Sequence, residues 1–341
     1  MNSKDSYSET MDIDNTTFAY HRLRVRFFAH KDLTLKGWIG AVLRNNFLVQ
    51  AASVADGKGK TLFDQLNTLP LAETHPAWKA LQGGFPKAIW FDCRDMPVNN
   101  RNHCLKANQI YSFTLVVAHR FIANLPFIAE ALYRMFSKGF GHPVVSTTLI
   151  DLCAYDLSGQ WQLCYQPEIG LIRMPDNPVG ISDFQLAPDS PSEISIRIDF
   201  ETPVNLFRPR TKKDTELSFQ DKLNGFPSFY QFMRSLVYRV QTLELLYGDQ
   251  TGTRGWQTSE IDSFLQKACS AQLQEVNLKS QKVHGTPKQG SNHVYVLEGY
   301  QGYQIWRQVP STYLPLLAFG MGLLVGNQVQ YSLGAYTITI L

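Results

Sequence analysis

The order of strand-like and helix-like segments is the feature of this sequence that most limits the folds open to it. Alternating or β-branched apolar runs predict strands, and apolar residues at helical spacing predict helices. In the first half the segments follow one another as β-α-β-β-α-β, over residues 20–29, 37–50, 87–93, 109–119, 125–138 and 144–155. A further arm at residues 161–173 is expected to form a hairpin with the last strand. This order is typical of the split βαβ unit of a ferredoxin-like fold.

The same order of segments recurs after a stretch rich in Pro, Asp and Ser, residues 175–191, which predicts a domain boundary. The second series consists of residues 194–200, 226–247, 272–283, 293–300, 313–324 and 336–341. A chain of 341 residues is long enough for two domains of ordinary size. We therefore predict an α+β protein with two tandem ferredoxin-like (RRM-like) domains. The predicted parts are a disordered lead-in, an N-terminal domain and a C-terminal domain, at residues 1–18, 19–185 and 190–341.

Charge and cysteine content narrow the function classes only slightly. A formal net charge of +3 is compatible with a nucleic-acid partner but does not require one, because local patches matter more than the total. Five cysteines at irregular spacing form no CxxC pair, so we expect reduced thiols in the cytoplasm, with no disulfide framework and no metal site. The most apolar stretch, residues 314–325, is too short to span a bilayer, and the N-terminus lacks the hydrophobic run of a signal peptide. We expect no membrane association.

The C-terminal run of residues 314–338 is the most informative segment for function. A predicted helix there enters a loop that contains Gly326 and Gly334 and leads directly into a strand. Glycines let a backbone approach a ligand closely, and successive exposed N–H groups can hold a phosphate. The alternative is an ordinary turn between a helix and a strand.

This run resembles the C-terminal signature of CRISPR-associated pre-crRNA-processing endoribonucleases of the RAMP superfamily. The matching residues are Leu314, Pro315, Leu316, Leu317, Gly320, Gly326, Leu333, Gly334 and Tyr336. Other pieces of the family pattern agree in the correct order, at residues 40–47, 125–141, 202–203, 229–248 and 299–302. The resemblance extends from about Arg24 to the C-terminus.

The sequence also departs from the family pattern. In the glycine-rich loop, Asn327 and Ala335 stand where the family usually has Lys and Arg, and Ser332 replaces another glycine. Two charges that would face phosphates are therefore missing, which weakens salt-dependent RNA affinity. In the first helix, Asn45 replaces a glycine.

The resemblance implies metal-independent cleavage of CRISPR repeat RNA, with no cofactor. The 2′-OH attacks its own phosphate and leaves a 2′,3′-cyclic phosphate and a 5′-OH, which requires a base, an acid and a cation. Family members that have a catalytic histidine carry it near the first strand or helix, so His30 is the leading candidate, with His21 at the start of the strand as another. His142, in the loop after Gly141, is a second catalytic candidate, and its alternative is a capping or turn role. Lys31 or Arg44 would stabilise the phosphate and Tyr20 would assist His30. Alternatively, His30 is a surface turn residue and Arg44 pairs with a carboxylate on its helix face.

Three groups of residues are candidates for RNA contacts. Arg22, Arg24 and Arg26 alternate along the first strand, which places them on one face of the sheet. They could follow the phosphates of an RNA or simply face solvent. The second group is the basic loop after the Thr-Pro step, and the third combines the glycine-rich loop with His142. These two groups comprise Arg208, Arg210, Lys212, Lys213, Gly326, Asn327, Gln328, Gln330, Ser332, Gly334 and His142.

Three functional hypotheses follow. The first is a repeat-RNA endoribonuclease that matures guide RNA, whose partners would be pre-crRNA and other CRISPR effector or adaptation proteins. The second is a non-catalytic RNA-binding relative that caps or scaffolds a guide-RNA complex, which the weakened glycine-rich loop favours. The third is an unrelated α+β protein.

Overall fold

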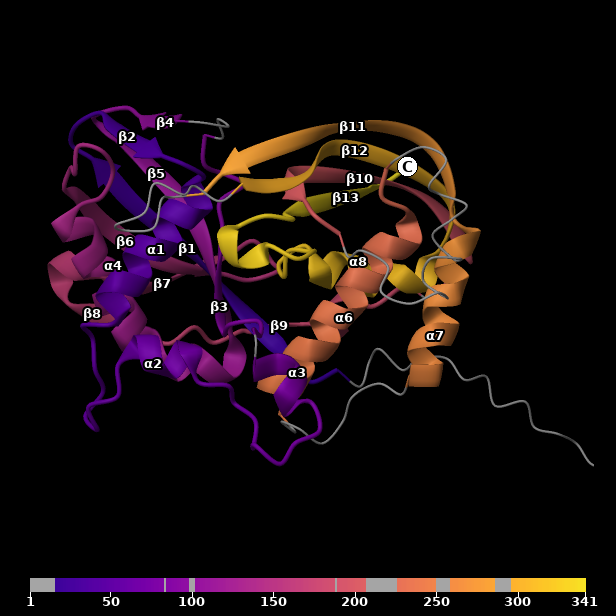
Figure 1. The fold of residues 1–341 in the computed structure, drawn as a ribbon, viewed down its shortest axis with the longest axis horizontal. Coiled ribbons are helices and arrows are strands. Elements are labelled where there is room, and N and C mark those ends of the chain that lie inside the picture. The colour runs from indigo at the N-terminus through magenta and orange to yellow at the C-terminus, as the bar shows by residue number, and fades with distance from the viewer. Residues whose placement is uncertain are drawn as a thin grey trace, which may run out of the picture.

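The computed structural model describes residues 16–82, 84–97, 102–187, 189–206, 226–249, 258–285 and 296–341. Figure 1 shows two main sheets with their helices, the N-terminal part in indigo to magenta and the C-terminal part in rose to yellow. One sheet takes its strands from residues 19–180 and the other from residues 193–340. The predicted boundary segment, residues 175–191, overlaps the first range at 175–180 and ends before the second range begins. The domain boundary stays a prediction.

The first sheet has the strand order β3-β5-β1-β6 of a ferredoxin-like fold, and neighbouring strands are antiparallel. β7 and β8 extend the sheet beyond β6, β9 pairs with the start of β1, and β2 pairs with β4 in a separate ladder. The strands are β1 (Ala19–Ala29), β2 (Leu33–Lys36), β3 (Ile89–Asp92), β4 (Asn102–Leu105), β5 (Gln109–Ala118), β6 (Thr147–Tyr155), β7 (Trp161–Gln166), β8 (Leu171–Ile172) and β9 (Val179–Gly180). The helices are α1 (Ile39–Ala51), α2 (Leu62–Asn67), α3 (Trp78–Gln82) and α4 (Leu125–Lys138).

Alternation along β1 explains how the first sheet obtains its core. Leu23, Val25 and Phe27 are fully buried, and the Phe27 ring stacks 4.8 Å from the Phe136 ring of α4. Arg22, Arg24 and Arg26 alternate with these apolar residues and face the opposite side of the sheet. α1 and α4 contact each other and cover the apolar side (Figure 1).

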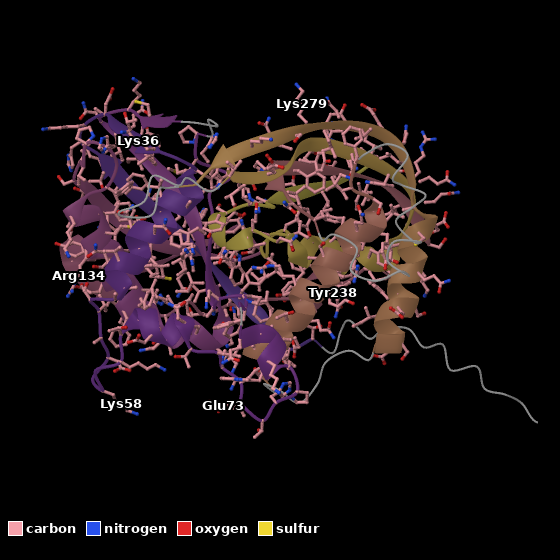
Figure 2. All side chains as sticks on the ribbon, in the orientation of Figure 1. Lys36, Lys58, Glu73, Arg134, Tyr238 and Lys279 are labelled. Atoms are coloured by element: carbon pink, nitrogen blue, oxygen red, sulfur yellow. The ribbon has the colours of Figure 1, made fainter. Side chains whose placement is uncertain are left out.

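The second sheet repeats this topology with the strand order β11-β12-β10-β13. Side chains fill the space between this sheet and its helices (Figure 2). The Phe232 ring of α6 meets the Tyr336 ring of β13 edge-on, with 5.0 Å between the centroids. The elements are β10 (Glu193–Val204), α6 (Phe229–Tyr247), α7 (Thr258–Lys267), β11 (Gln272–His284), β12 (Val296–Pro310), α8 (Leu314–Gly320) and β13 (Tyr336–Ile340).

The end of β3 joins the first half to the segment that follows α8. The indole Nε1 of Trp90 donates to the Gly322 carbonyl at 3.0 Å. Arg94 donates from its two Nη atoms to the carbonyls of Met321 and Tyr336, at 2.7 and 3.0 Å. Its guanidinium also pairs with the buried Asp92 carboxylate, at 2.7 Å. The halves therefore meet through a hydrogen-bonded junction that contains a buried charge pair.

The α+β class and the tandem ferredoxin-like architecture predicted from the sequence are confirmed. The sequence patterns did not indicate β2, β4, α2 or α3, which are short. α7 was also missed, although its buried residues Ile261, Phe264 and Leu265 follow helical spacing. The predicted lead-in of residues 1–18 is too long, because Phe18 is fully buried and its amide donates to Glu244 Oε2 at 2.6 Å. Residues 1–15 of the lead-in lie outside the described residues.

Candidate nucleic-acid interface

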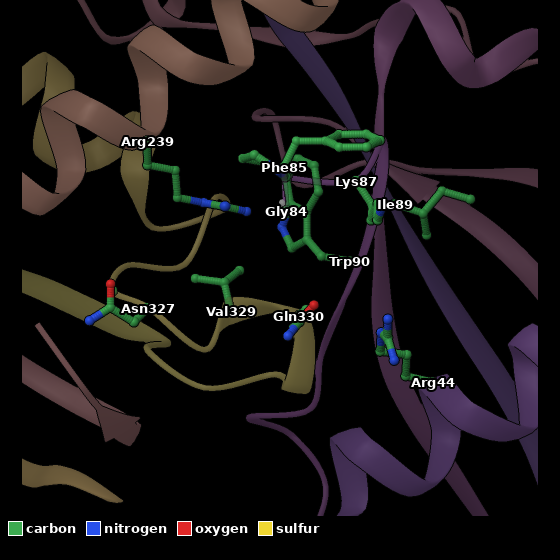
Figure 3. A pocket seen from close by; sticks show the side chains of 12 residues that line it. Arg44, Gly84, Phe85, Lys87, Ile89, Trp90, Arg239, Asn327, Val329 and Gln330 are labelled. Carbon is green, nitrogen blue, oxygen red and sulfur yellow. The ribbon is translucent and has the colours of Figure 1, made fainter. Parts of the chain in front are cut away.

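A cavity of about 580 Å³ lies where the two halves meet. Segments from both halves form its walls: α1, the approach to β3, α6 and the glycine-rich loop. In Figure 3 the side chains of Arg44 and Arg239 enter it from opposite sides of the view. Its polar lining includes Arg44, Lys87, Arg239, Asn327 and Gln330, and no carboxylate belongs to the described residues that line it.

Lys87 and Arg44 make one side of this cavity strongly positive. Burial lowers the pKa of Lys87, and the nearby charge of Arg44 lowers it further. The Lys87 ammonium lies 3.6 Å from the centre of the Phe85 ring, and the Arg44 guanidinium lies 5.6 Å from the centre of the Tyr331 ring. Because two like charges repel each other here, an anionic ligand would be favoured between them.

Arg239 supplies the positive charge on the other side. Its Nε donates to the Leu323 carbonyl at 2.6 Å, and its guanidinium lies 5.1 Å from the centre of the Trp90 ring. Burial lowers the pKa of Arg239 to about 9, so the side chain remains charged at neutral pH. Among the residues that the structure describes, no carboxylate forms a salt bridge with it.

The glycine-rich loop borders the cavity, but its glycines serve the packing of the protein. Gly334 has φ +82, and a Cβ there would lie 1.8 Å from the Val325 carbonyl oxygen. Gly326 has φ +101 and packs in the same way against the Asn205 carbonyl. Both positions therefore require glycine because protein backbone, rather than a ligand, comes close.

Most of the loop amides that were expected to hold a phosphate are used within the protein. The amides of Val325, Asn327 and Gly334 donate to the carbonyls of Gly334, Asn205 and Pro203 respectively. Ala335 N donates to Thr202 Oγ1 at 2.8 Å. The prediction that this loop is an amide cradle is therefore wrong for these residues, and the loop contributes side chains to the cavity.

Six loop residues predicted to bind RNA have different surroundings. Asn327 and Gln330 are exposed and line the cavity, and Gly326 borders it. Ser332 is fully buried and its Oγ accepts from Cys93 N at 2.8 Å. The prediction that Ser332 contacts RNA is therefore wrong. Gly334 is equally enclosed. Gln328 is only half-buried, but its Oε1 is buried and has no hydrogen-bond partner among the described residues.

The predicted catalytic residues do not lie together. Tyr20 is buried, its hydroxyl donates to the Phe319 carbonyl at 3.0 Å, and burial raises its pKa. His30 is exposed at the other end of β1, ten residues away, which is roughly 33 Å in an extended strand. The prediction that Tyr20 assists His30 is therefore wrong.

His30 is also remote from the cavity that contains Arg44. Sheet register aligns the cavity residue Trp90 with Val116 and Val116 with Arg22, eight residues before His30. That separation is roughly 26 Å along the strand. The His30 ring nitrogen Nε2 shares a 2.7 Å hydrogen bond with Thr148 Oγ1, and Lys31 beside it is exposed. The structure thus separates His30 and Lys31 from Arg44.

Two other predicted histidines have different surroundings. His142 is exposed, and its amide donates to the Thr34 carbonyl at 2.8 Å, in the turn that follows α4. His21 is buried, and its Nε2 lies 2.9 Å from His119 Nδ1. Burial and the charge of His119 lower the pKa of His21 to about 4.

Arg22, Arg24 and Arg26 do share one face of the first sheet, as their spacing predicts. Arg26 forms a salt bridge with Asp151, whereas the guanidinium groups of Arg22 and Arg24 lie over aromatic rings. The remaining predicted RNA contacts, Arg208, Arg210, Lys212 and Lys213, lie outside the described residues.

Lys87 and Arg239 are cavity residues that sequence reasoning missed. Lys87 stands at the start of a predicted strand with no motif around it, and Arg239 belongs to a matched helix pattern that assigns it no role. Within the described ranges, no group of three His, Cys, Asp or Glu side chains is placed to hold a metal ion. A search of the described helices for a candidate membrane span found none.

Comparisons with known proteins identify the fold. No protein-family model matches the sequence, and a search of curated proteins found no match. A Thermus thermophilus Cas6 product complex is similar in structure, with a TM-score of 0.53 at 11% identity over 94% of this chain and 99% of that one. A further Thermus thermophilus Cas6 structure gives a TM-score of 0.50 at 12% identity, with the same coverage.

A longer protein shares the same architecture in part. In a partial Cas6-RT-Cas1–Cas2 complex, 96% of this chain matches 47% of the other chain, with a TM-score of 0.54 at 11% identity. The chain therefore has the fold found in Cas6 structures. The family resemblance predicted from sequence motifs is confirmed at the level of fold.

Proposed function

From the Cas6 fold and the cationic cavity between the two halves, we propose that this chain binds CRISPR repeat RNA. The proposal rests on one observation: Arg44, Lys87 and Arg239 come from three separate segments and line one cavity without a carboxylate among its described lining residues. RNA presents a phosphate at every nucleotide, and arginine and lysine are the side chains that neutralise it.

The size and lining of the cavity support an RNA ligand over a lone anion. Its volume of about 580 Å³ has room for more than a phosphate group. The Asn327 and Gln330 side chains add amide donors and acceptors beside the three cations. The Phe85 ring, half-buried at the rim, adds an apolar surface against which a ribose or base could pack.

Binding of a CRISPR repeat transcript by the full chain tests this proposal. We expect Lys87→Gln to weaken binding because one phosphate contact is lost. Lys279→Gln is the matched control, since Lys279 is exposed on β11 and projects outward in Figure 2. Equal affinity of wild type and Lys87→Gln for the repeat would show that the cavity does not bind RNA.

A second proposed activity is endonucleolytic processing of the bound repeat RNA without a metal ion. It is favoured by the exposed His30 imidazole, which Thr148 orients and which lies next to the exposed Lys31. The proton of the attacking 2′-OH passes to a base, the 2′-oxygen bonds to phosphorus, and the bond to the 5′-oxygen breaks as that oxygen is protonated. An imidazole suits either proton role near neutral pH.

Cleavage of the repeat transcript in EDTA, with wild type and His30→Ala compared, tests this activity. We expect a product that ends in a 2′,3′-cyclic phosphate from wild type and a loss of at least about 100-fold in rate from the variant. Binding without cleavage by both proteins would leave the non-catalytic alternative, in which the chain caps or scaffolds a guide-RNA complex. Equal cutting by both would remove His30 from the reaction.

We also propose that other CRISPR proteins are partners of this chain. The supporting observation is that a similar fold forms 47% of a longer chain in a Cas6-RT-Cas1–Cas2 complex. Co-purification of the tagged chain with its neighbouring CRISPR proteins, with and without RNase treatment, measures whether such contacts are direct.

A further inference from the structure

The outer face of the first sheet carries a stack of two guanidinium groups and two aromatic rings. The Arg24 Cζ lies 3.5 Å from the centre of the Trp161 ring, and the Arg22 Cζ lies 5.4 Å from the centre of the Tyr155 ring. The two rings are themselves 4.5 Å apart. The stack is built across β1, β6 and β7 by sheet register, because Tyr155 pairs with Trp161 in the hairpin between β6 and β7.

Within the part of the chain that the structure describes, Arg24 in the stack lacks the salt-bridge partner that the neighbouring Arg26 has. Arg26, two residues along, is occupied by its salt bridge with Asp151. Arg24 has no such partner among the described residues, and its buried Nε lacks a hydrogen-bond acceptor there. Burying a charged donor without an acceptor is costly unless a ligand or water supplies one.

Trp161 is 45% exposed, which leaves part of a large aromatic surface in solvent. Unpaired RNA bases stack on exposed aromatic side chains and on arginine planes, and phosphates attract the guanidinium charge. Ile169 and Ile172, which lie beyond β7 at the β8 edge of this sheet, are also exposed, and a protein partner could cover them. The two arginines in the stack favour RNA, since their charges would be desolvated against an apolar protein surface.

This stack is separate from the cavity between the halves. β3 lines the cavity, and four strand spacings in the order β3-β5-β1-β6-β7 separate it from β7. At about 4.8 Å per spacing the two places are roughly 19 Å apart across the sheet. A single RNA could therefore contact both places only if the strand continues beyond the cavity and across the sheet to the stack.

We propose that the Trp161 and Arg24 stack is a second RNA site that takes unpaired nucleotides, with a base stacked on the indole and a phosphate on the arginines. This inference rests on the proposed function that the chain binds RNA. It adds a substrate class to that function, because bases inside a duplex are stacked on one another and cannot offer a face to Trp161.

Fluorescence anisotropy of the full chain with two labelled probes tests the proposal. One probe is a 15-nucleotide oligouridylate, and the other is a blunt RNA duplex of 16 base pairs. We expect Trp161→Ala to weaken oligouridylate binding about 10-fold and to leave duplex binding unchanged, since one stacked base is lost. Trp161→Phe should restore most of the affinity, because it keeps an aromatic face.

Leu157→Ala is the matched control, because Leu157 is an exposed apolar residue in the turn of the same hairpin. It should bind both probes as wild type does. Unchanged oligouridylate binding by Trp161→Ala, with weakened binding by Lys87→Gln, would overturn the second site and keep the proposed function. Absence of RNA binding by wild type would overturn both.

Crosslinking reads out the same site without a substitution. With 4-thiouridine in the oligouridylate, we expect the crosslinked peptide of the wild-type chain to contain Trp161. Crosslinks confined to peptides of the cavity would contradict the proposal. Loss of self-association or of a co-purifying protein in Trp161→Ala, with RNA binding intact, would instead identify the stack as a protein-docking surface and overturn it.

Discussion

The guanidinium of Arg239 in α6 lies 5.1 Å from the centre of the Trp90 ring in β3, and so joins a helix of the second half to a strand of the first. The same indole donates to the Gly322 carbonyl. The cavity proposed to bind RNA is therefore lined by residues of both halves, and it depends on their docking. Substitutions at the junction should affect stability and RNA binding together.

Arg94→Ala tests how strongly the junction holds the halves together. The variant loses the donors to Met321 and Tyr336 and leaves the Asp92 carboxylate buried without its cation. Breaking a buried charge pair from one side costs about 3 kcal/mol of unfolding free energy. Urea denaturation of the variant and of wild type at neutral pH measures this loss.

Arg173→Ala is the control for Arg94→Ala, since it breaks an exposed pair with Asp176. It should cost less than about 1 kcal/mol, because solvent screens that pair. Equal losses for the two variants would show that the junction adds little to stability.

Gly334→Ala tests the interpretation that the glycine-rich loop is shaped by packing. A methyl group there would meet the Val325 carbonyl oxygen, and φ is +82. We expect thermal denaturation to show a loss of at least about 2 kcal/mol. Gly59→Ala has a similar φ of +79 but no atom within 4 Å of its Cβ, so only the backbone preference of about 1 kcal/mol should be lost. A loss for Gly334→Ala no larger than that of Gly59→Ala contradicts the packing account.

The lowered pKa of His21 predicts that the protein loses stability as the pH falls. Burial, followed by the charge of His119, lowers its folded-state pKa to about 4, whereas the unfolded chain titrates near its ordinary value of 6.5. Above pH 6.5 both states are neutral at this site, and between 6.5 and 4 the unfolded state takes up the proton first. Stability should therefore fall by up to roughly 3 kcal/mol over that window.

His21→Phe removes this titration, so its stability relative to wild type should rise as the pH falls from 7 to 4.5. Urea midpoints at several pH values measure the difference. Leu157→Ala is the control, because it changes an exposed side chain that does not titrate. A difference between His21→Phe and wild type that is constant with pH would show that His21 does not cause the loss.

The fold could be predicted from the sequence because each half repeats strong local patterns. Alternation in β1 and the apolar period of α4, which ends at Gly139, gave both the element types and nearly correct bounds. The resemblance to a known family correctly indicated the architecture. β2 and β4 were missed because each contributes only a short strand whose partner is distant in sequence.

The candidate site was harder to predict, because it is created by contacts between distant segments. Arg44, Asn327 and Gln330 were predicted to bind RNA or assist catalysis, and they do line one cavity. Lys87 and Arg239 join them only through the docking of the halves, which no local pattern encodes. The sequence indicated that Gly326 and Gly334 matter, but not that packing requires them. The backbone carbonyls that approach them come from Asn205, far away in the chain, and from Val325, across the loop.

The salt dependence of repeat-RNA binding tests the central claim most directly. The slope of log affinity against log salt concentration should fall by roughly 1.5 in Arg44→Gln/Lys87→Gln, because two phosphate contacts are lost. Lys58→Gln/Lys279→Gln, which removes two exposed charges remote from the cavity, should keep the wild-type slope (Figure 2). A cavity variant with the wild-type slope and affinity would contradict the claim that RNA phosphates bind between the two halves.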